Sequence, residues 1–145
     1  MVKVLIKKLD PEVEIPTYKS AGASGMDLMA FTKQPIKLAP KNSCLVPTGI
    51  SVAFSEEYEI QIRPRSGLAA KNNISILNTP GTIDSDYRGE IKIILFNHGS
   101  NEFIINNKDR VAQMILSPVI KMEIEEVKSL PSTVRGKGGF GSTGK

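Results

Sequence analysis

The sequence predicts an all-β fold, either a barrel or a sandwich, in a single domain. Many short apolar segments alternate with turns rich in Gly, Pro and Asn, which is the pattern of an antiparallel β protein. One stretch alone, residues 68–71, favours helix, and it is about one or two turns long. With 145 residues, the chain can bury a core without disulfides or metal ions.

Before the helix, the expected strands are bounded by prolines and glycines. They cover residues 2–6, 36–38, 44–46, 50–54 and 58–63. The last of these, YEIQIR, alternates strictly, so Ile60 and Ile62 should share the buried face. Residues 21–30, AGASGMDLMA, are small and glycine-rich around one acid, Asp27.

After the helix, the expected strands cover residues 74–77, 91–96, 103–105, 111–116 and 122–127. Pro118 lies between the last two, where a proline can end a strand. The C-terminal residues, RGKGGFGSTGK, include five glycines in eleven positions, so they cannot build a core element. We therefore expect residues 1–134 to form the β domain and residues 135–145 to be its flexible arm.

Composition narrows the class of function. The single cysteine, Cys44, excludes an intramolecular disulfide and fits a reducing compartment. The N-terminal segment is too rich in lysine for a signal peptide, and no apolar run approaches the roughly 20 residues of a membrane span. We expect a cytoplasmic protein. The modest net charge of +4 and the few aromatic residues favour a small polyphosphate ligand, with neither nucleic acid nor membrane as partner.

The chemistry is expected to centre on residues 81–97, GTIDSDYRGEIKIILFN, where two acids and an aromatic ring precede a buried strand. Asp84 and Asp86 can orient water, bind a metal or simply close Asx turns. Tyr87 is either a platform for a ligand or a half-buried turn residue. One cysteine and one histidine, His98, do not make a zinc site, and no nucleophile elbow supports a Ser-His-Asp triad.

Two further segments can bind anions. In PRSGLAAK, residues 64–71, Arg65 can fork onto phosphate oxygens and Ser66 begins the short helix. The alternative is ordinary helix capping beside a solvated arginine. The glycine-rich tail carries cations and hydroxyls but is not a Walker A motif. It is either a disordered tail or a phosphate-binding arm, and Phe140 favours the second because one aromatic in a flexible run needs a flat partner.

Together, these residues resemble the trimeric deoxyuridine triphosphate nucleotidohydrolases, the dUTPases. Five segments match that family's motifs in order: ASGMDLMA, PRSGLAAK, NTPGTIDSDYRGEIKIILFN, RVAQMILSPV and RGKGGFGSTG. An extra Ala-Ser in AGASGMDL is a small departure. The resemblance implies a distorted β-barrel or jelly-roll-like subunit in a homotrimer. It also implies active sites at the subunit interfaces, with each C-terminal arm reaching a neighbour's site.

The resemblance also implies roles for individual residues. Asp84 matches the base that deprotonates the attacking water, and Asp27 matches an acid near the metal and the catalytic centre. Mg²⁺ is expected as cofactor, held mainly by substrate phosphates and water. The residues that match substrate contacts are Arg65, Ser66, Gly67, Asn78, Gly81, Thr82, Ile83, Tyr87, Lys92, Gln113, Arg135, Phe140, Gly141, Ser142 and Thr143.

The implied reaction is hydrolysis of dUTP to dUMP and pyrophosphate. Two alternatives stand beside it. A dCTP deaminase, a fold relative, would use a glutamate, and Glu90 is the nearest one to the third motif. A non-catalytic nucleotide-binding trimer is the other, although Asp84 and an intact arm argue against it.

Overall fold

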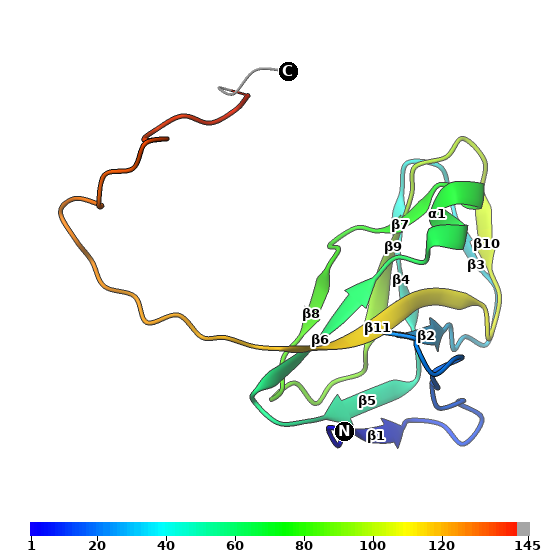
Figure 1. Ribbon diagram of the computed structural model, residues 1–145. Helices are drawn as coiled ribbons and strands as arrows, with labels where there is room; N and C mark the ends of the chain where they lie inside the picture. Colours follow the sequence, from blue (N-terminus) through cyan, green and yellow to red (C-terminus); the bar gives the residue numbers. More distant parts are fainter. Residues whose placement is uncertain (142–145) are drawn as a thin grey trace.

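The computed structural model describes residues 1–141, and these residues form eleven strands and one helix. Figure 1 shows the strands gathered in one body, from which the chain after β11 extends away as a long segment that ends in the arm. In chain order, the elements are β1 Leu5–Lys8, β2 Met26–Met29, β3 Ile36–Leu38, β4 Ser43–Pro47, β5 Ile50–Ala53, β6 Tyr58–Arg63, α1 Ser66–Asn72, β7 Ile74–Ile76, β8 Gly81–Ile83, β9 Lys92–Asn97, β10 Phe103–Ile105 and β11 Arg110–Pro118.

The strands form four antiparallel sheets. A four-stranded sheet has the order β2-β11-β6-β8, and a three-stranded sheet has the order β4-β9-β7. Two pairs, β1-β5 and β10-β3, complete the body. The prediction of an all-β fold with one short helix is confirmed. Within the described part of the chain, the hydrogen-bonded ladders stop between the four sheets instead of closing one continuous barrel.

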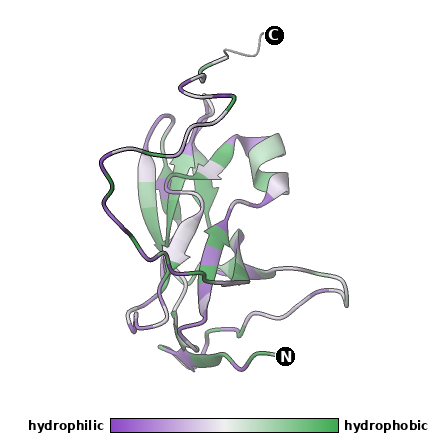
Figure 2. Cartoon of the chain, turned by 60° about the vertical axis from the view of Figure 1, so that its left-hand side comes forward, coloured by the Kyte–Doolittle hydropathy of each residue, from purple (hydrophilic) through white to green (hydrophobic). Residues whose placement is uncertain are grey.

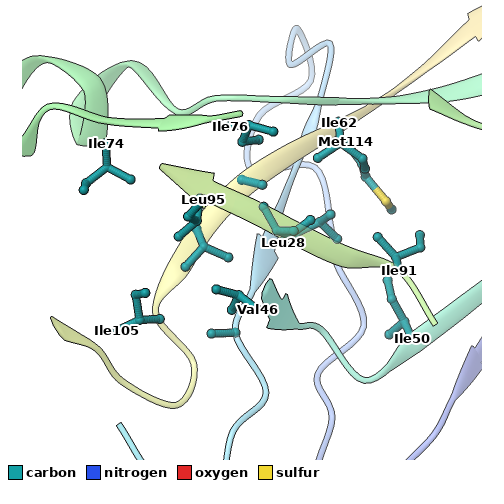
Figure 3. Close-up of a cluster of buried hydrophobic side chains, with 14 of the residues drawn as sticks. Leu28, Val46, Ile50, Ile62, Ile74, Ile76, Ile91, Leu95, Ile105 and Met114 are labelled. Atoms are coloured by element: carbon teal, nitrogen blue, oxygen red, sulfur yellow. The ribbon is translucent and has the colours of Figure 1, made fainter. Parts of the chain in front are cut away.

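Side chains from both larger sheets meet in one core (Figure 3). Ile60 and Ile62 point inward from β6, as predicted from their alternation, and are 2% and 3% exposed. Leu95 of β9, in the three-stranded sheet, belongs to the same buried cluster. Each fully buried Ile or Leu stabilises the fold by roughly 1.5–3 kcal/mol relative to an exposed one. The core therefore holds the four-stranded sheet, which carries many of the expected site residues, in a fixed position.

The C-terminal part of the prediction needs a correction. Residues 122–127 do not form a strand; they lie extended and exposed beyond the end of β11 at Pro118. Ile120, Met122 and Ile124 are 84% or more exposed. Their alternation is a strand signal, but a strand needs a hydrogen-bonding neighbour, and the described residues supply none at this segment. Figure 2 shows hydrophobic and hydrophilic residues mixed along the chain after β11.

Two strands, β2 and β8, were not predicted, because their sequences lack a strand pattern although each has a pairing partner. β2 and β8 lie in glycine-rich segments that read as turns, yet both pair in the four-stranded sheet. Gly81 of β8 is buried against β6, where an added Cβ would come 3.3 Å from Ile62 Cβ. Tertiary pairing, and not local propensity, makes these residues strands.

The helix α1 has seven residues and is followed by its C-cap, Asn73, which adopts a left-handed conformation with φ 56°. It buries none of its residues fully, and Leu68 packs partly against the core. Nowhere among residues 1–141 is there a helix of the length and apolarity that crossing a membrane requires.

Candidate active site

A cluster of charged side chains lies where β2, β11 and the start of α1 meet. Nε of Arg65 lies 2.9 Å from Oδ1 of Asp27, and both side chains are mostly buried. Nη1 of Arg65 also donates to the Arg110 carbonyl at 3.1 Å. Nη1 of Arg110 lies 3.5 Å from the other Asp27 oxygen. Two guanidinium groups thus converge on one carboxylate and leave net positive charge at this point.

Gln113 belongs to the same cluster through the register of the four-stranded sheet. It pairs with Asp27 on β2 and with Arg63 on β6. Residues directly opposite in an antiparallel sheet point to the same face, so these three side chains form one row on the outer face. The amide Nε2 of Gln113 donates to the Pro64 carbonyl at 3.0 Å, which ties this row to the segment that carries Arg65.

Ser66 and Gly67 open the helix beside this cluster and are exposed. The N-cap of α1 is Arg65, and no side chain caps the helix. Ser66 is therefore not the capping residue that the simpler interpretation required, and Arg65 is bound to Asp27 instead of being solvated. Ordinary capping by Ser66 beside a solvated arginine is therefore not what the structure shows, and anion binding at this turn stays a prediction.

A second group of candidate residues lies on the loop after β8. Asp84 and Asp86 are both exposed. The Tyr87 N–H donates to the Asp84 carbonyl at 3.1 Å, and the Arg88 guanidinium donates to the carbonyls of Ser85 and Tyr87 at 2.6 and 3.0 Å. The turn is closed by these main-chain and arginine contacts. Asp84 therefore remains exposed to solvent, and no described residue bonds to its carboxylate.

Tyr87 is held in place on this loop. Its hydroxyl donates to the Glu90 carbonyl at 3.0 Å, and its side chain passes over Gly89, where a Cβ would overlap the Tyr87 hydroxyl. The residue is nevertheless 43% exposed. An aromatic ring that is fixed at its far end and open on one side can serve as a platform.

Most of the other residues expected to contact the substrate lie on or next to β8. Gly81 is buried, Ile83 is half-buried, and Asn78 and Thr82 are exposed. Thr82 pairs with Gln61 of β6, so its side chain points to the same outer face as Gln113. Lys92 lies on β9, with its Nζ 3.6 Å from Oε2 of Glu90.

Within one chain, the two groups lie at opposite ends of β6. Asp84 follows β8, which pairs with β6 as far as Ile60. Gln113 pairs with Arg63 at the other end, and Arg65 follows in extended backbone. Arg65 is five residues beyond Ile60, or about 17 Å along an extended chain at roughly 3.3 Å per residue. One chain alone does not bring Asp84 to the arginine cluster.

The described part of the arm, residues 135–141, lies away from the body of strands that carries both groups (Figure 1). Phe140 is fully exposed, and the Arg135 Nε donates to the Gly138 carbonyl of the arm itself at 2.8 Å. Ser142 and Thr143, which were also expected to bind substrate, lie outside the described residues.

The surroundings of Glu90, Cys44 and His98 disfavour the other kinds of catalysis that the sequence left open. Oε1 of Glu90 accepts the Gly49 N–H at 2.9 Å, so this carboxylate is not available for deamination. Burial raises the pKa of the Cys44 thiol, which disfavours the nucleophilic thiolate. Exposed His98 lies 2.8 Å from the Ser75 hydroxyl, but the described residues place no carboxylate behind its ring, and a triad is not formed.

Sequence reasoning missed two arginines of these groups. Arg110 begins the RVAQ segment and Arg88 follows Tyr87, so both were inside quoted motifs. Only their positions inside these motifs could have indicated them, because their contacts with Asp27 and with the loop carbonyls appear only in the folded chain.

Comparison with known proteins identifies the family of the chain. A family model described as dUTPase matches residues 11–144. The deoxyuridine 5'-triphosphate nucleotidohydrolase of Wolinella succinogenes is 53% identical over 144 residues, which is 99% of this chain and 95% of that protein. The protein of the same name from Chlamydia pneumoniae is also 53% identical, over 94% of this chain and 95% of that protein. The chain belongs to the dUTPase family.

Solved structures share the fold. The dUTPase of Staphylococcus bacteriophage 80alpha, with dUpNHpp, has a TM-score of 0.88 over 99% of each chain, at 22% identity. A dUTPase variant from phage phi11 of S. aureus has a TM-score of 0.80 at 20% identity, over 90% of this chain and 99% of that one. That structure is described as revealing the coordination of a structural Mg(II) ion.

Proposed function

We propose that this protein hydrolyses dUTP to dUMP and pyrophosphate; its relatives are named deoxyuridine 5'-triphosphate nucleotidohydrolases. The observation that carries the proposal is the exposed Asp84 carboxylate, on a loop that also presents Tyr87, in a chain with a separate two-arginine cluster around Asp27. The reaction removes dUTP from the DNA precursors and supplies dUMP for dTMP synthesis. We place it in the cytoplasm.

In the proposed mechanism, Asp84 orients a water molecule in line with the α-phosphorus and accepts its proton. The new bond forms between the water oxygen and the α-phosphorus, and the bond to the bridging oxygen breaks, so that pyrophosphate leaves. Arg65, Ser66 and Gln113 bind phosphate oxygens, and the Arg65 guanidinium also neutralises part of their charge. Phosphoryl transfer needs positioning and charge neutralisation more than covalent help, and a positioned base contributes about 10²–10⁴ in rate.

The base and the sugar are read by the segment around β8. Asn78 and the main chain of β8 offer fixed donors and acceptors that match uracil and leave polar groups unpaired against cytosine. Tyr87 lies under the deoxyribose, where it crowds a 2′-hydroxyl. The segment is suited to this task because its pairing with β6 fixes its backbone.

Magnesium fits this donor set through the substrate. No group of three or more His, Cys, Asp or Glu able to hold a metal occurs among residues 1–141, and Mg²⁺ commonly keeps several waters while binding substrate phosphates with few protein ligands. Asp27 is the carboxylate in the phosphate-binding cluster and would meet the hydrated ion there. When bound, Mg²⁺ would neutralise phosphate charge and orient the triphosphate.

The proposed assembly is a homotrimer with active sites shared between subunits. Asp84 lies beyond the Ile60 end of β6, and Arg65 lies about 17 Å along the extended chain from Ile60, so a site that uses both needs a second copy of the chain. The exposed apolar residues after β11, among them Ile120 and Ile124, need a partner surface of the kind that a neighbouring subunit provides. In this assembly, the arm with Arg135 and Phe140 closes over a neighbour's site.

A substrate panel tests the activity. Pyrophosphate release should be fast with dUTP and near background with dCTP, dTTP, dATP and dGTP, and it should fall when Mg²⁺ is removed by a chelator. Ammonia release from dCTP, measured on the same samples, would instead support the deaminase. Binding of dUTP without release of pyrophosphate would support a non-catalytic nucleotide-binding protein.

The proposed trimer with shared active sites can be tested by its mass and by mixing inactive variants. Light scattering should give a mass of three chains, and a monomer mass would contradict the assembly. Co-refolding equal amounts of the inactive variants Asp84→Asn and Arg65→Ala should recover activity, because roughly a quarter of all the sites formed would combine an intact Asp84 with an intact Arg65. Each variant refolded alone is the control. If mixing recovers nothing while mixed trimers form, both residues act from the same chain.

A further inference from the structure

Glu90 follows the glycine beneath the Tyr87 side chain, and the proposed chemistry gives its carboxylate no task. This side chain is 21% exposed, and its Oε1 accepts the Gly49 N–H at 2.9 Å. The main-chain carbonyl of the same residue accepts the Tyr87 hydroxyl at 3.0 Å. One residue therefore connects the Tyr87 ring to the turn between β4 and β5.

The turn between β4 and β5 is held rigidly by packing and hydrogen bonds. Gly49 is buried with φ +69°, and a Cβ there would overlap the Val13 side chain, so the turn depends on glycine. The Thr48 hydroxyl donates to the Ile91 carbonyl at 2.6 Å. The Ile91 N–H donates to the Ile50 carbonyl at 2.9 Å. Three hydrogen bonds thus fix residues 90 and 91 on a turn that is packed into the core.

The position of the Tyr87 ring depends on this anchored segment. Its hydroxyl has the Glu90 carbonyl as acceptor, and the absence of a side chain at Gly89 gives the ring room to reach it. The neighbouring loop carries its own contacts from Arg88. If the Glu90 carbonyl shifts, the far end of the ring loses its fixed point while the loop backbone remains closed.

We propose that Glu90 is a positioning residue for sugar selection. Through its bond with Gly49 it holds the carbonyl that orients Tyr87, and so it contributes to the preference for a 2′-deoxyribose over a ribose. This inference rests on the proposed function, in which Tyr87 crowds a 2′-hydroxyl. A steric filter of this kind is sensitive to displacements of about 1 Å, because the atom it excludes is itself small.

The test is the ratio of kcat/KM for dUTP to kcat/KM for UTP. Glu90→Ala should narrow this ratio by about threefold to tenfold, because the carbonyl that holds the ring loses its support. Glu90→Gln keeps an acceptor for the Gly49 N–H and should restore most of the ratio. Glu102→Ala removes an exposed glutamate outside this network and should leave the ratio unchanged.

A double-mutant cycle separates positioning from general destabilisation. Tyr87→Phe removes the hydroxyl donor, so adding Glu90→Ala to it should narrow the ratio no further. Thr48→Val, which removes the bond to the Ile91 carbonyl, gives a second, milder variant that should also narrow the ratio, in case Glu90→Ala does not fold. Equal losses of kcat/KM for dUTP and UTP in Glu90→Ala and Thr48→Val, or additive effects in the cycle, would overturn the role of Glu90.

Tyr87→Ala tests the underlying filter independently. It should narrow the dUTP preference more than any Glu90 variant, because the ring itself is absent. If Tyr87→Ala leaves the ratio unchanged, the sugar filter is wrong. If Tyr87→Ala narrows it while the Glu90 variants do not, the filter stands and only the positioning role is rejected.

Discussion

Asp84→Asn is expected to lower kcat by about 10²-fold or more while the Kd for dUTP stays close to that of the unaltered protein. The amide has nearly the same shape as the carboxylate and can still orient a water molecule, but it cannot accept the proton that the water must lose. Asp84 is exposed on a loop whose closure uses main-chain and Arg88 contacts, so the substitution should not disturb folding. Single-turnover kinetics with dUTP measure the chemical step, and titration in Ca²⁺ in place of Mg²⁺ measures binding.

Asp86→Asn is the matched control for this prediction. Asp86 is a second exposed acid two residues away on the same loop, and we assign it a turn or support role. Its substitution should change kcat by less than about tenfold. Turnover near normal in Asp84→Asn would remove its assignment as the base. A loss in Asp86→Asn as large as that in Asp84→Asn would show that the two acids work as a unit.

Removal of residues 135–145 is expected to abolish most activity and to leave the melting temperature almost unchanged. The described part of this arm makes its hydrogen bonds within itself, as Arg135 does with Gly138, or to the adjacent Thr133, and Phe140 is fully exposed. It therefore buries too little surface in its own chain to stabilise the β domain. In the proposed assembly the same residues close a neighbour's site over the uracil and the phosphates, so their loss removes contacts that the transition state needs.

Thermal unfolding and pyrophosphate release, measured on the same truncated protein, check both halves of this prediction. Phe140→Ala in the full-length chain is a useful companion, because it removes the one aromatic ring of the arm and keeps the backbone. It should retain more activity than the truncation. A drop of many degrees in melting temperature would show that the arm is part of the folded domain, and full activity would remove it from the site.

Much of the strand pattern could be predicted because it depends on local sequence. The strict alternation in YEIQIR placed Ile60 and Ile62 in the core, as the structure shows. Residues 68–71 were expected to be helical and lie within α1, and β11 ends at Pro118. In each case a short-range rule, side-chain alternation or the missing N–H of proline, was sufficient.

The remaining elements depended on partners far away in the chain. β2 and β8 are strands because β11 and β6 pair with them, and their glycines alone indicated turns. Residues 122–127 alternate like a strand and yet remain unpaired among the described residues. Strand identity is decided by the neighbour as much as by the segment, and one segment cannot specify its neighbour.

By itself, the sequence determined the all-β class, the motifs of the dUTPase family and the residues that can carry the chemistry, because residue type and spacing encode these directly. Only the tertiary structure decided how those residues are grouped. It joined Asp27 to Arg65 and Arg110, and it held Asp84 and Tyr87 at the other end of β6. It also turned Glu90 from a candidate acid into a support for Tyr87. These relations arise from strand register and from hydrogen bonds across the fold, which no local pattern contains.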